Sequence, residues 1–158
     1  MNLTHKPSKW VIGVDASNIR IGGGVTHLVE LLNAIDVESF FIEKIVIWGS
    51  KQTLARLPSF PWLLKKHPAA LEGGLISRMR WQAFSLSKEA ALCGCQVLLV
   101  PGGSYVGSFH PVVTMCQNQL PFDWKMILKS GFSIRTAKFV LLRWIQSASF
   151  KRSDGVIF

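Results

Sequence analysis

Short segments rich in apolar residues alternate with segments of helical periodicity along this chain, and this alternation restricts the fold more than any other feature of the sequence. The apolar runs are 10–15, 40–48, 96–100, 111–116 and 153–158. The helical segments are 25–36, 75–92 and 134–150, and the prolines of the stretch 58–68 are expected to break it into loops and short pieces. Buried strands separated by helices are typical of a parallel sheet with helices on both faces. The sequence therefore predicts an α/β fold.

Composition narrows the class of protein. The chain has 158 residues, of which 49% are hydrophobic and 17% charged, and this balance excludes an intrinsically disordered segment and favours one domain. The formal net charge of +9 predicts an anionic partner such as a phosphate, a membrane surface or a nucleic acid. No recognised nucleic-acid-binding motif accompanies the charge, so a nucleic-acid partner is not expected.

Targeting signals and cysteines give negative information. Residues 1–9 are polar and lack the apolar core of a secretory signal. The sequence contains no run of about 20 apolar residues, the length needed to span a bilayer, so a cytoplasmic protein is expected. The three cysteines are too few for a disulfide framework and lack the spacing of a metal site. We expect reduced, structural thiols and no bound metal.

A glycine-rich loop follows the first predicted strand. Gly22, Gly23 and Gly24 lie between the strand and a helix, where flexible backbone and free helix N–H groups can receive a phosphate or a sugar hydroxyl. The spacing matches neither the dinucleotide fingerprint nor a Walker loop. His27, in the first helical turn, either faces this cleft or is structural, and the loop itself could be a plain strand-to-helix turn.

A second group of polar residues follows two later strands, and ligands of open parallel sheets bind at the carboxyl ends of strands. These residues are Gly103, Ser104, Tyr105, Gln117, Asn118 and Asp123. Neutral donors and acceptors beside glycine backbone suit sugar hydroxyls. The alternative is that Gln117 and Asn118 only satisfy loop backbone groups.

The region from Lys125 to Arg152 is basic and contains no acidic residue. Its cations are Lys125, Lys129, Arg135, Lys138, Arg143, Lys151 and Arg152. A basic helix with interleaved aromatic residues fits an anionic bilayer surface. The alternative is an ordinary helix with a solvated basic face, whose apolar stripe, including Trp144, packs in the core.

Six segments, in order along nearly the whole chain, resemble the amino-terminal half of family 4 glycosyltransferases. These are Ile12-Gly-Val-Asp-Ala-Ser17, Gly22-Gly-Gly-Val-Thr-His-Leu28, Arg80-Trp81-Gln82, Pro101-Gly-Gly-Ser104, Val113-Thr-Met-Cys-Gln-Asn-Gln-Leu-Pro-Phe122 and Ser153-Asp-Gly-Val-Ile-Phe158. Such enzymes have the GT-B architecture, which consists of two Rossmann-like domains. Gln96 departs from the pattern, because an Asp is common at that position.

The resemblance implies a retaining transfer of sugar from a nucleotide-sugar donor to a glycan or lipid-linked acceptor, without a metal or another cofactor. Residues 1–158 would be the acceptor-side Rossmann-like domain, incomplete at its C-terminal end. Gly22, Gly23 and Gly24 would face the donor phosphates, and Gln117 and Asn118 would lie near the transferred sugar.

The same resemblance would place the catalytic residues and most of the donor site in a second domain that this chain lacks, so the chain alone is expected not to transfer sugar. The enzyme is expected in the cytoplasm, with possible peripheral contact with the inner face of the membrane. The alternative function is a non-catalytic Rossmann-like module that binds a phosphate-bearing ligand.

Overall fold

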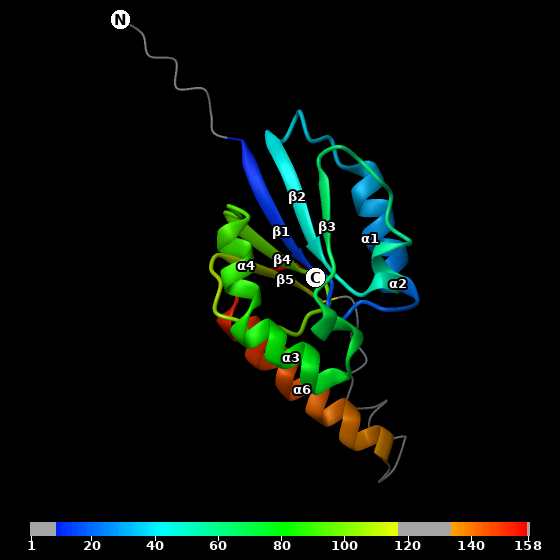
Figure 1. Ribbon diagram of the computed structural model, residues 1–158. Helices are drawn as coiled ribbons and strands as arrows, with labels where there is room; N and C mark the ends of the chain where they lie inside the picture. Colours follow the sequence, from blue (N-terminus) through cyan, green and yellow to red (C-terminus); the bar gives the residue numbers. More distant parts are fainter. Residues whose placement is uncertain (1–8, 117–133, 158) are drawn as a thin grey trace, which may run out of the picture.

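The computed structural model describes residues 9–116 and 134–157, which form one six-stranded sheet with flanking helices (Figure 1). The strands are β1 (Trp10–Asp15), β2 (Ile42–Trp48), β3 (Leu63–Lys66), β4 (Val97–Val100), β5 (Val112–Met115) and β6 (Gly155–Ile157). The helices are α1 (Gly23–Ala34), α2 (Lys51–Leu54), the 3-10 turn η1 (Ala69–Glu72), α3 (Leu75–Phe84), α4 (Leu86–Leu92) and α6 (Ile134–Arg152). The strand order is β3-β2-β1-β4-β5-β6 and every neighbouring pair is parallel. The predicted α/β fold is confirmed, and the sheet is Rossmann-like.

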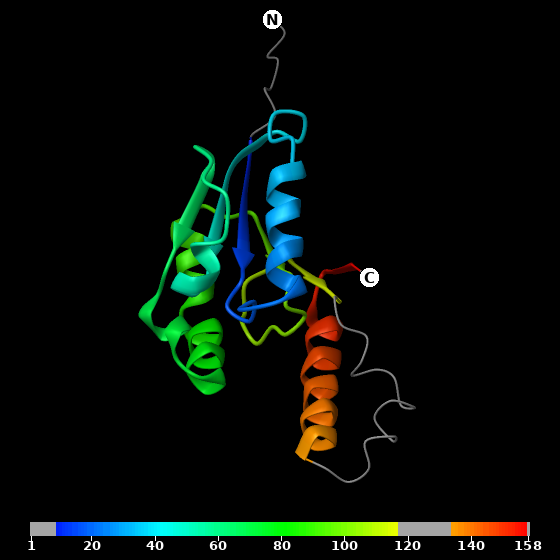
Figure 2. The ribbon, with the colours of Figure 1, turned by 90° about the vertical axis from the view of Figure 1, so that its right-hand side faces the viewer.

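Two hydrophobic cores lie on opposite faces of the sheet, because successive side chains of a strand point to opposite faces. On one face, α1 packs through Leu28 and Leu32 against Ile45 and Ile47 of β2. On the other face, Trp48 of β2 packs in the cluster that receives α3 and α4. Figure 2 shows α1 on one side of the strands and α3 with α4 on the other. The expectation of helices on both faces is therefore confirmed.

The edge strand β3 was not among the predicted strands, since the proline-containing stretch was expected to form loops and short pieces. Leu63–Lys66 pairs in parallel with β2, from Ile45 to Trp48. Prolines are tolerated beside an edge strand, where one side of the backbone needs no partner. The two lysines of β3 also remove the continuous apolar run that marks the central strands.

The helix expected over 75–92 is two helices, α3 and α4, which meet at Ser85. Trp81 and Leu86 are both buried in the same core cluster. Five positions correspond to about 140° around a straight helix, which would point these two side chains in different directions. The break at Ser85 therefore lets both helices bury an apolar side chain on one face of the sheet.

The buried face of α6 was predicted wrongly. The apolar stripe was expected to pack in the core with Trp144, but Trp144 is 73% exposed and Leu141 is 57% exposed. Gln146 and Ser149 are buried instead. Ser149 Oγ accepts a hydrogen bond of 2.8 Å from the backbone N–H of Tyr105. The inner face of α6 is polar because it packs against loop backbone, which needs hydrogen-bond partners, rather than against the apolar sheet.

Candidate functional site

A pocket of about 440 Å³ lies at the carboxyl ends of β1 and β4, the two neighbouring strands between which the strand order reverses. Ligands of open α/β sheets bind at such a position. Five segments line the pocket: the loop after β1, the start of helix α1, helix α3, the loop after β4, and helix α6. The two loops approach closely, because a Cβ on Gly102 would lie 3.2 Å from the Cβ of Asn18. Segments that are far apart in the sequence therefore share one cavity.

The structure brings two of the predicted site residues to this pocket and leaves others outside it. Gly24 and Ser104 line the pocket. Gly22 and Gly23 are exposed at the start of α1, and Gly103 is buried beside Ser104. His27 is exposed and is not among the lining residues. The predicted residues Gln117 and Asn118 lie outside the described residues.

Two of these glycines have backbone conformations that favour glycine. Gly22, the N-terminal cap of α1, has φ 75° and ψ −154°, and it offers no side-chain cap to the helix N–H groups. Gly103 has φ 68°, and a Cβ there would lie 3.1 Å from the carbonyl oxygen of Met115. Gly23 differs, because a Cβ at that position would meet nothing within 4 Å. The loop therefore leaves open space beside the start of α1.

Arg20 is the first cation of the pocket and was not predicted. Its Nη2 donates hydrogen bonds to the carbonyl oxygens of Leu71 and Gly73, the second at 3.0 Å, while its Nε is buried with no partner among the described residues. Ile19, the residue before Arg20, is fixed by Thr53, whose Oγ1 donates a hydrogen bond of 2.6 Å to the Ile19 carbonyl oxygen. The guanidinium is thus held in place through only part of its donor set.

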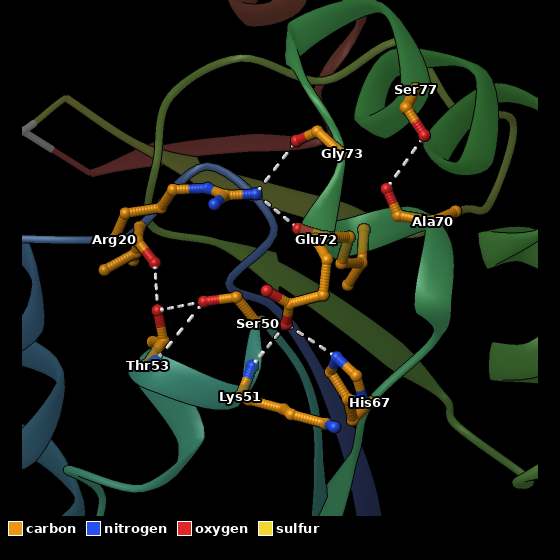
Figure 3. A network of polar contacts seen from close by, with 11 residues as sticks. Arg20, Ser50, Lys51, Thr53, His67, Ala70, Glu72, Gly73 and Ser77 are labelled. Carbon is orange, nitrogen blue, oxygen red and sulfur yellow. Dashed lines mark hydrogen bonds and ion pairs between the residues drawn. The ribbon is translucent and has the colours of Figure 1, made fainter.

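Glu72 lies in the same polar network as Arg20 but is engaged elsewhere (Figure 3). Its Oε1 lies 2.7 Å from His67 Nε2 and accepts a 2.7 Å hydrogen bond from the Lys51 backbone N–H. The bond from Lys51 is the main cause of the lowered pKa of Glu72, followed by the bond with His67, and the charge of Arg20 contributes least. Glu72 and Arg20 form no ion pair within the described part of the chain.

Arg78 is the second cation of the pocket. Its Nη1 donates to the Ser17 carbonyl oxygen at 3.2 Å and to Asn18 Oδ1 at 3.3 Å, so it joins α3 to the loop after β1. Burial lowers the pKa of the Arg78 guanidinium, and the charge of Arg20 lowers it further. Like Arg20, it forms no ion pair with any described carboxylate. The pocket therefore contains two neighbouring guanidiniums, neither of which forms a direct ion pair with a described carboxylate.

Gln82 connects three of the segments around the pocket. This side chain, 2% exposed, donates through Nε2 to Asp15 Oδ2 and to the Ser104 carbonyl oxygen, and its Oε1 accepts from the Val106 N–H at 2.9 Å. Asp15 also accepts from the Ser17 N–H at 3.0 Å. Burial raises the pKa of Asp15, and its hydrogen bonds with Gln82 and Ser17 oppose that effect. The end of β1 and the loop after β4 are thus joined by one amide.

Gln146 of α6 supplies a different group to the pocket. The side chain is 5% exposed, and its Oε1 is buried without a hydrogen-bond partner among the described residues. Buried acceptors are nearly always satisfied in native proteins, by protein, by water or by a ligand. The pocket can therefore accept a hydrogen bond at this point as well as donate several from the arginines.

The residues that sequence reasoning missed differ in the signal that could have revealed them. Arg20 lies in the loop directly after β1, so the rule on the carboxyl ends of strands applied to it as much as to the glycines. Arg78 and Gln146 lie on helices that no local pattern places beside that loop. Only the packing of α3 and α6 identifies them.

The basic region is only partly described. Lys125 and Lys129 lie outside the described residues, as do the side chains of Arg135 and Lys138 on α6. Arg143 is half-buried and, with Trp144 and Lys151, lines a hollow of about 400 Å³ on the outer side of the helix. In the part of the chain that the structure describes, no helix combines the length and apolar character needed to cross a membrane.

Neither a metal centre nor a disulfide is present in residues 9–116 and 134–157. No group of three or more His, Cys, Asp or Glu side chains is placed there to hold a metal ion. Cys93, Cys95 and Cys116 form no disulfide among the described residues. Burial raises the pKa of the Cys95 thiol to about 11, so this sulfur stays protonated at neutral pH.

Comparisons of this chain with models of known protein families, with curated proteins and with solved structures found no match. Any proposal for the function of this chain therefore rests on its own sequence and geometry. The chain has a Rossmann-like, all-parallel sheet with a positively charged pocket at the point where the strand order reverses.

Proposed function

We propose that this chain is the acceptor-side domain of a retaining glycosyltransferase, which transfers a sugar from a nucleotide-sugar donor to a glycan or lipid-linked acceptor. The pocket between β1 and β4 takes the part of the substrate where sugar and phosphate meet. The catalytic groups and most of the donor site are supplied by a second domain.

One observation carries this proposal. Three of the segments on which the resemblance rests are joined by the side chain of Gln82, which bonds to Asp15 in the first segment and to Ser104 in the loop after β4. Gly24, from the glycine-rich segment, lines the same pocket. Residues scattered over the sequence thus surround one cavity, and its neutral and cationic donors suit sugar hydroxyls and phosphates.

The outer face of α6 supports peripheral contact of this enzyme with an anionic membrane. Leu141 and Trp144 are exposed on this helix, and Trp144 lines the same hollow as Lys151. Apolar side chains insert at the headgroup level, and each nearby cation contributes about 1 kcal/mol at an anionic surface. We expect co-sedimentation with vesicles that contain phosphatidylglycerol, and weaker binding of Trp144→Ala. Equal binding to pure phosphatidylcholine vesicles, or none to either, would contradict this contact.

Binding of nucleotide sugars tests the proposed function directly. Saturation-transfer NMR on the 158-residue chain with a panel of uridine, guanosine and adenosine diphosphate sugars should show transfer to the sugar protons of at least one member. Gly23 is not a lining residue, but it directly precedes Gly24, which lines the pocket. Gly23→Ala should weaken binding of a ligand whose phosphate reaches the start of α1, because the added methyl group meets no protein atom within 4 Å and occupies that open space. Gly74→Ala, which also lies at the start of a helix in open space, is the matched control.

Each alternative predicts a different result. A chain that binds phosphate but does not distinguish nucleotide sugars from free nucleotides would be a non-catalytic binding module. Steep salt dependence of binding to random DNA, with no response to any nucleotide sugar, would indicate a nucleic-acid partner and overturn the proposal.

A further inference from the structure

The pocket contains two kinds of unsatisfied group, and together they specify the chemistry of a ligand. The positive groups are the guanidiniums of Arg20 and Arg78, which form no ion pair among the described residues. The neutral group is Gln146 Oε1, a buried acceptor without a described partner. The two guanidiniums favour an anion, and Gln146 Oε1 requires a hydrogen-bond donor.

The guanidinium pair is fixed before any ligand binds. Arg20 is held by the carbonyl oxygens of Leu71 and Gly73, and Arg78 by that of Ser17. These bonds leave further N–H donors on each guanidinium, including the buried Nε of Arg20. Two like charges held close together repel each other, and burial in the same pocket weakens their solvation. An anion between them removes both penalties, and phosphate offers several oxygens to planar guanidinium donors.

The start of α1 adds to this anion site. Gly22 caps the 12-residue helix without a side chain that would satisfy its first N–H groups, and Gly24 lines the pocket. The N-terminus of a helix carries a partial positive charge that favours phosphate. A sulfate or carboxylate would share this attraction, so the charge alone does not define the ligand.

Gln146 restricts the ligand further. Its Oε1 cannot accept a bond from a phosphate dianion, which has no donor, but it can accept one from a hydroxyl group. A site with a buried, unpaired acceptor discriminates against an analogue that lacks the matching hydroxyl. The ligand therefore carries both a phosphate and a hydroxyl-bearing group within one pocket of about 440 Å³.

We infer that Arg20, Arg78 and Gln146 form a binding site for a hydroxylated phosphate ester, in which the two guanidiniums bind the phosphate and Gln146 Oε1 accepts a hydrogen bond from a hydroxyl group of the ligand. This inference deepens the proposed function, because it names the substrate group that the pocket takes. The phosphate ester can belong to a free sugar phosphate or to a nucleotide sugar, which share this chemistry.

The test compares two ligands that differ in hydroxyl groups. Isothermal titration of the 158-residue chain with glucose 1-phosphate, cyclohexyl phosphate and glucose separates the phosphate from the hydroxyls. We expect glucose 1-phosphate to bind about 10-fold more tightly than cyclohexyl phosphate, and glucose to bind more weakly than either. A uridine diphosphate sugar forms the fourth arm and distinguishes a nucleotide-sugar site from a sugar-phosphate site.

The variants assign each preference to its residue. Arg78→Gln should weaken the binding of both phosphates by about 10- to 100-fold, whereas Arg80→Gln, the same change on an exposed position of α3, should not. Gln146→Met should remove the preference for glucose 1-phosphate over cyclohexyl phosphate and leave the binding of cyclohexyl phosphate unchanged.

A second measurement keeps the inference falsifiable if Arg78→Gln fails to fold, since Arg78 also anchors Ser17. In the native chain, glucose 1-phosphate should shift the NMR resonances of the Arg20 Nε–H and the Gln146 side-chain amide, and cyclohexyl phosphate only the former. The inference is overturned if neither resonance shifts, or if both phosphates bind equally. Binding of glucose 1-phosphate with this pattern, but of no nucleotide sugar, would support the site and contradict the part of the proposed function that places the sugar-phosphate end of a nucleotide-sugar donor in this pocket.

Discussion

Replacement of Gln82 by methionine tests whether one buried amide holds the pocket together. Methionine has nearly the same length and volume, so Gln82→Met leaves little cavity and removes mainly hydrogen bonds. The substitution leaves three partners behind: the Asp15 carboxylate, the Ser104 carbonyl oxygen and the Val106 N–H. The effect on the free energy of unfolding therefore comes from those three groups.

The magnitude follows from the chemistry of each partner. A hydrogen bond to a neutral backbone group contributes about 1 kcal/mol, and one to a buried carboxylate about 1.5–3 kcal/mol. We expect Gln82→Met to lower the free energy of unfolding by about 4 kcal/mol in total, which is a large part of the 5–15 kcal/mol typical of a domain. Gln52→Met, at an exposed position, should change it by less than about 0.5 kcal/mol.

The pH dependence of this destabilisation is a second, independent prediction. Burial raises the folded-state pKa of Asp15 above its unfolded value, so the contribution of Asp15 to stability is present at low pH, where it is protonated, and is lost as the pH rises through the folded pKa. Gln82 favours the charged form, and its removal raises that pKa further. The destabilisation by Gln82→Met should therefore be larger at pH 8 than at pH 5.

Urea unfolding followed by circular dichroism, at both pH values, measures this difference. A destabilisation below about 1 kcal/mol would refute the reasoning, because it would mean that the three orphaned groups find water or other partners at no cost. A destabilisation that is large but the same at pH 5 and pH 8 would show that Asp15 does not depend on Gln82.

Three further predictions concern stability. Gly103→Ala should lower the free energy of unfolding by about 1–3 kcal/mol, because φ at Gly103 is positive and the new Cβ would lie 3.1 Å from the Met115 carbonyl oxygen. Gly74→Ala, at a position with a negative φ and open space around the new Cβ, should leave the free energy of unfolding nearly unchanged in the same urea assay. Trp48→Phe should lower the free energy of unfolding by about 2–3 kcal/mol, because Trp48 is fully buried and its Nε1 donates to Glu89 Oε2 at 2.7 Å. Trp144→Phe, on the exposed face of α6, should lower it by less than about 0.5 kcal/mol, and similar urea midpoints for both variants would contradict this. Asp154→Asn should destabilise the chain more at pH 7 than at acid pH, because hydrogen bonds from the Val112 N–H and from His110 lower the pKa of Asp154. Its contribution to stability is present at neutral pH and is lost as the pH falls through the folded pKa, so an equal loss across the whole pH range would be inconsistent with these bonds.

The sequence alone determined the class of the fold and indicated which loops lie at the carboxyl edge of its sheet. Continuous apolar runs such as Val97–Val100 predict buried strands, and helices between them require a parallel sheet. Since the carboxyl ends of parallel strands meet at one edge, the sequence also predicted that the loops at Gly24 and Ser104 would approach each other. These inferences succeed because periodicity and chain connectivity are local properties.

The tertiary structure decided which side chains act together. Arg78 bonds to the carbonyl oxygen of Ser17, 61 positions away, and Gln82 to Asp15, 67 positions away. The inner face of α6 is polar although its sequence suggested an apolar stripe, because the helix packs against loop backbone that requires hydrogen bonds. Pairings of this kind depend on the order of strands in the sheet and on the desolvation of each group after packing. Both are set only when the whole chain has folded.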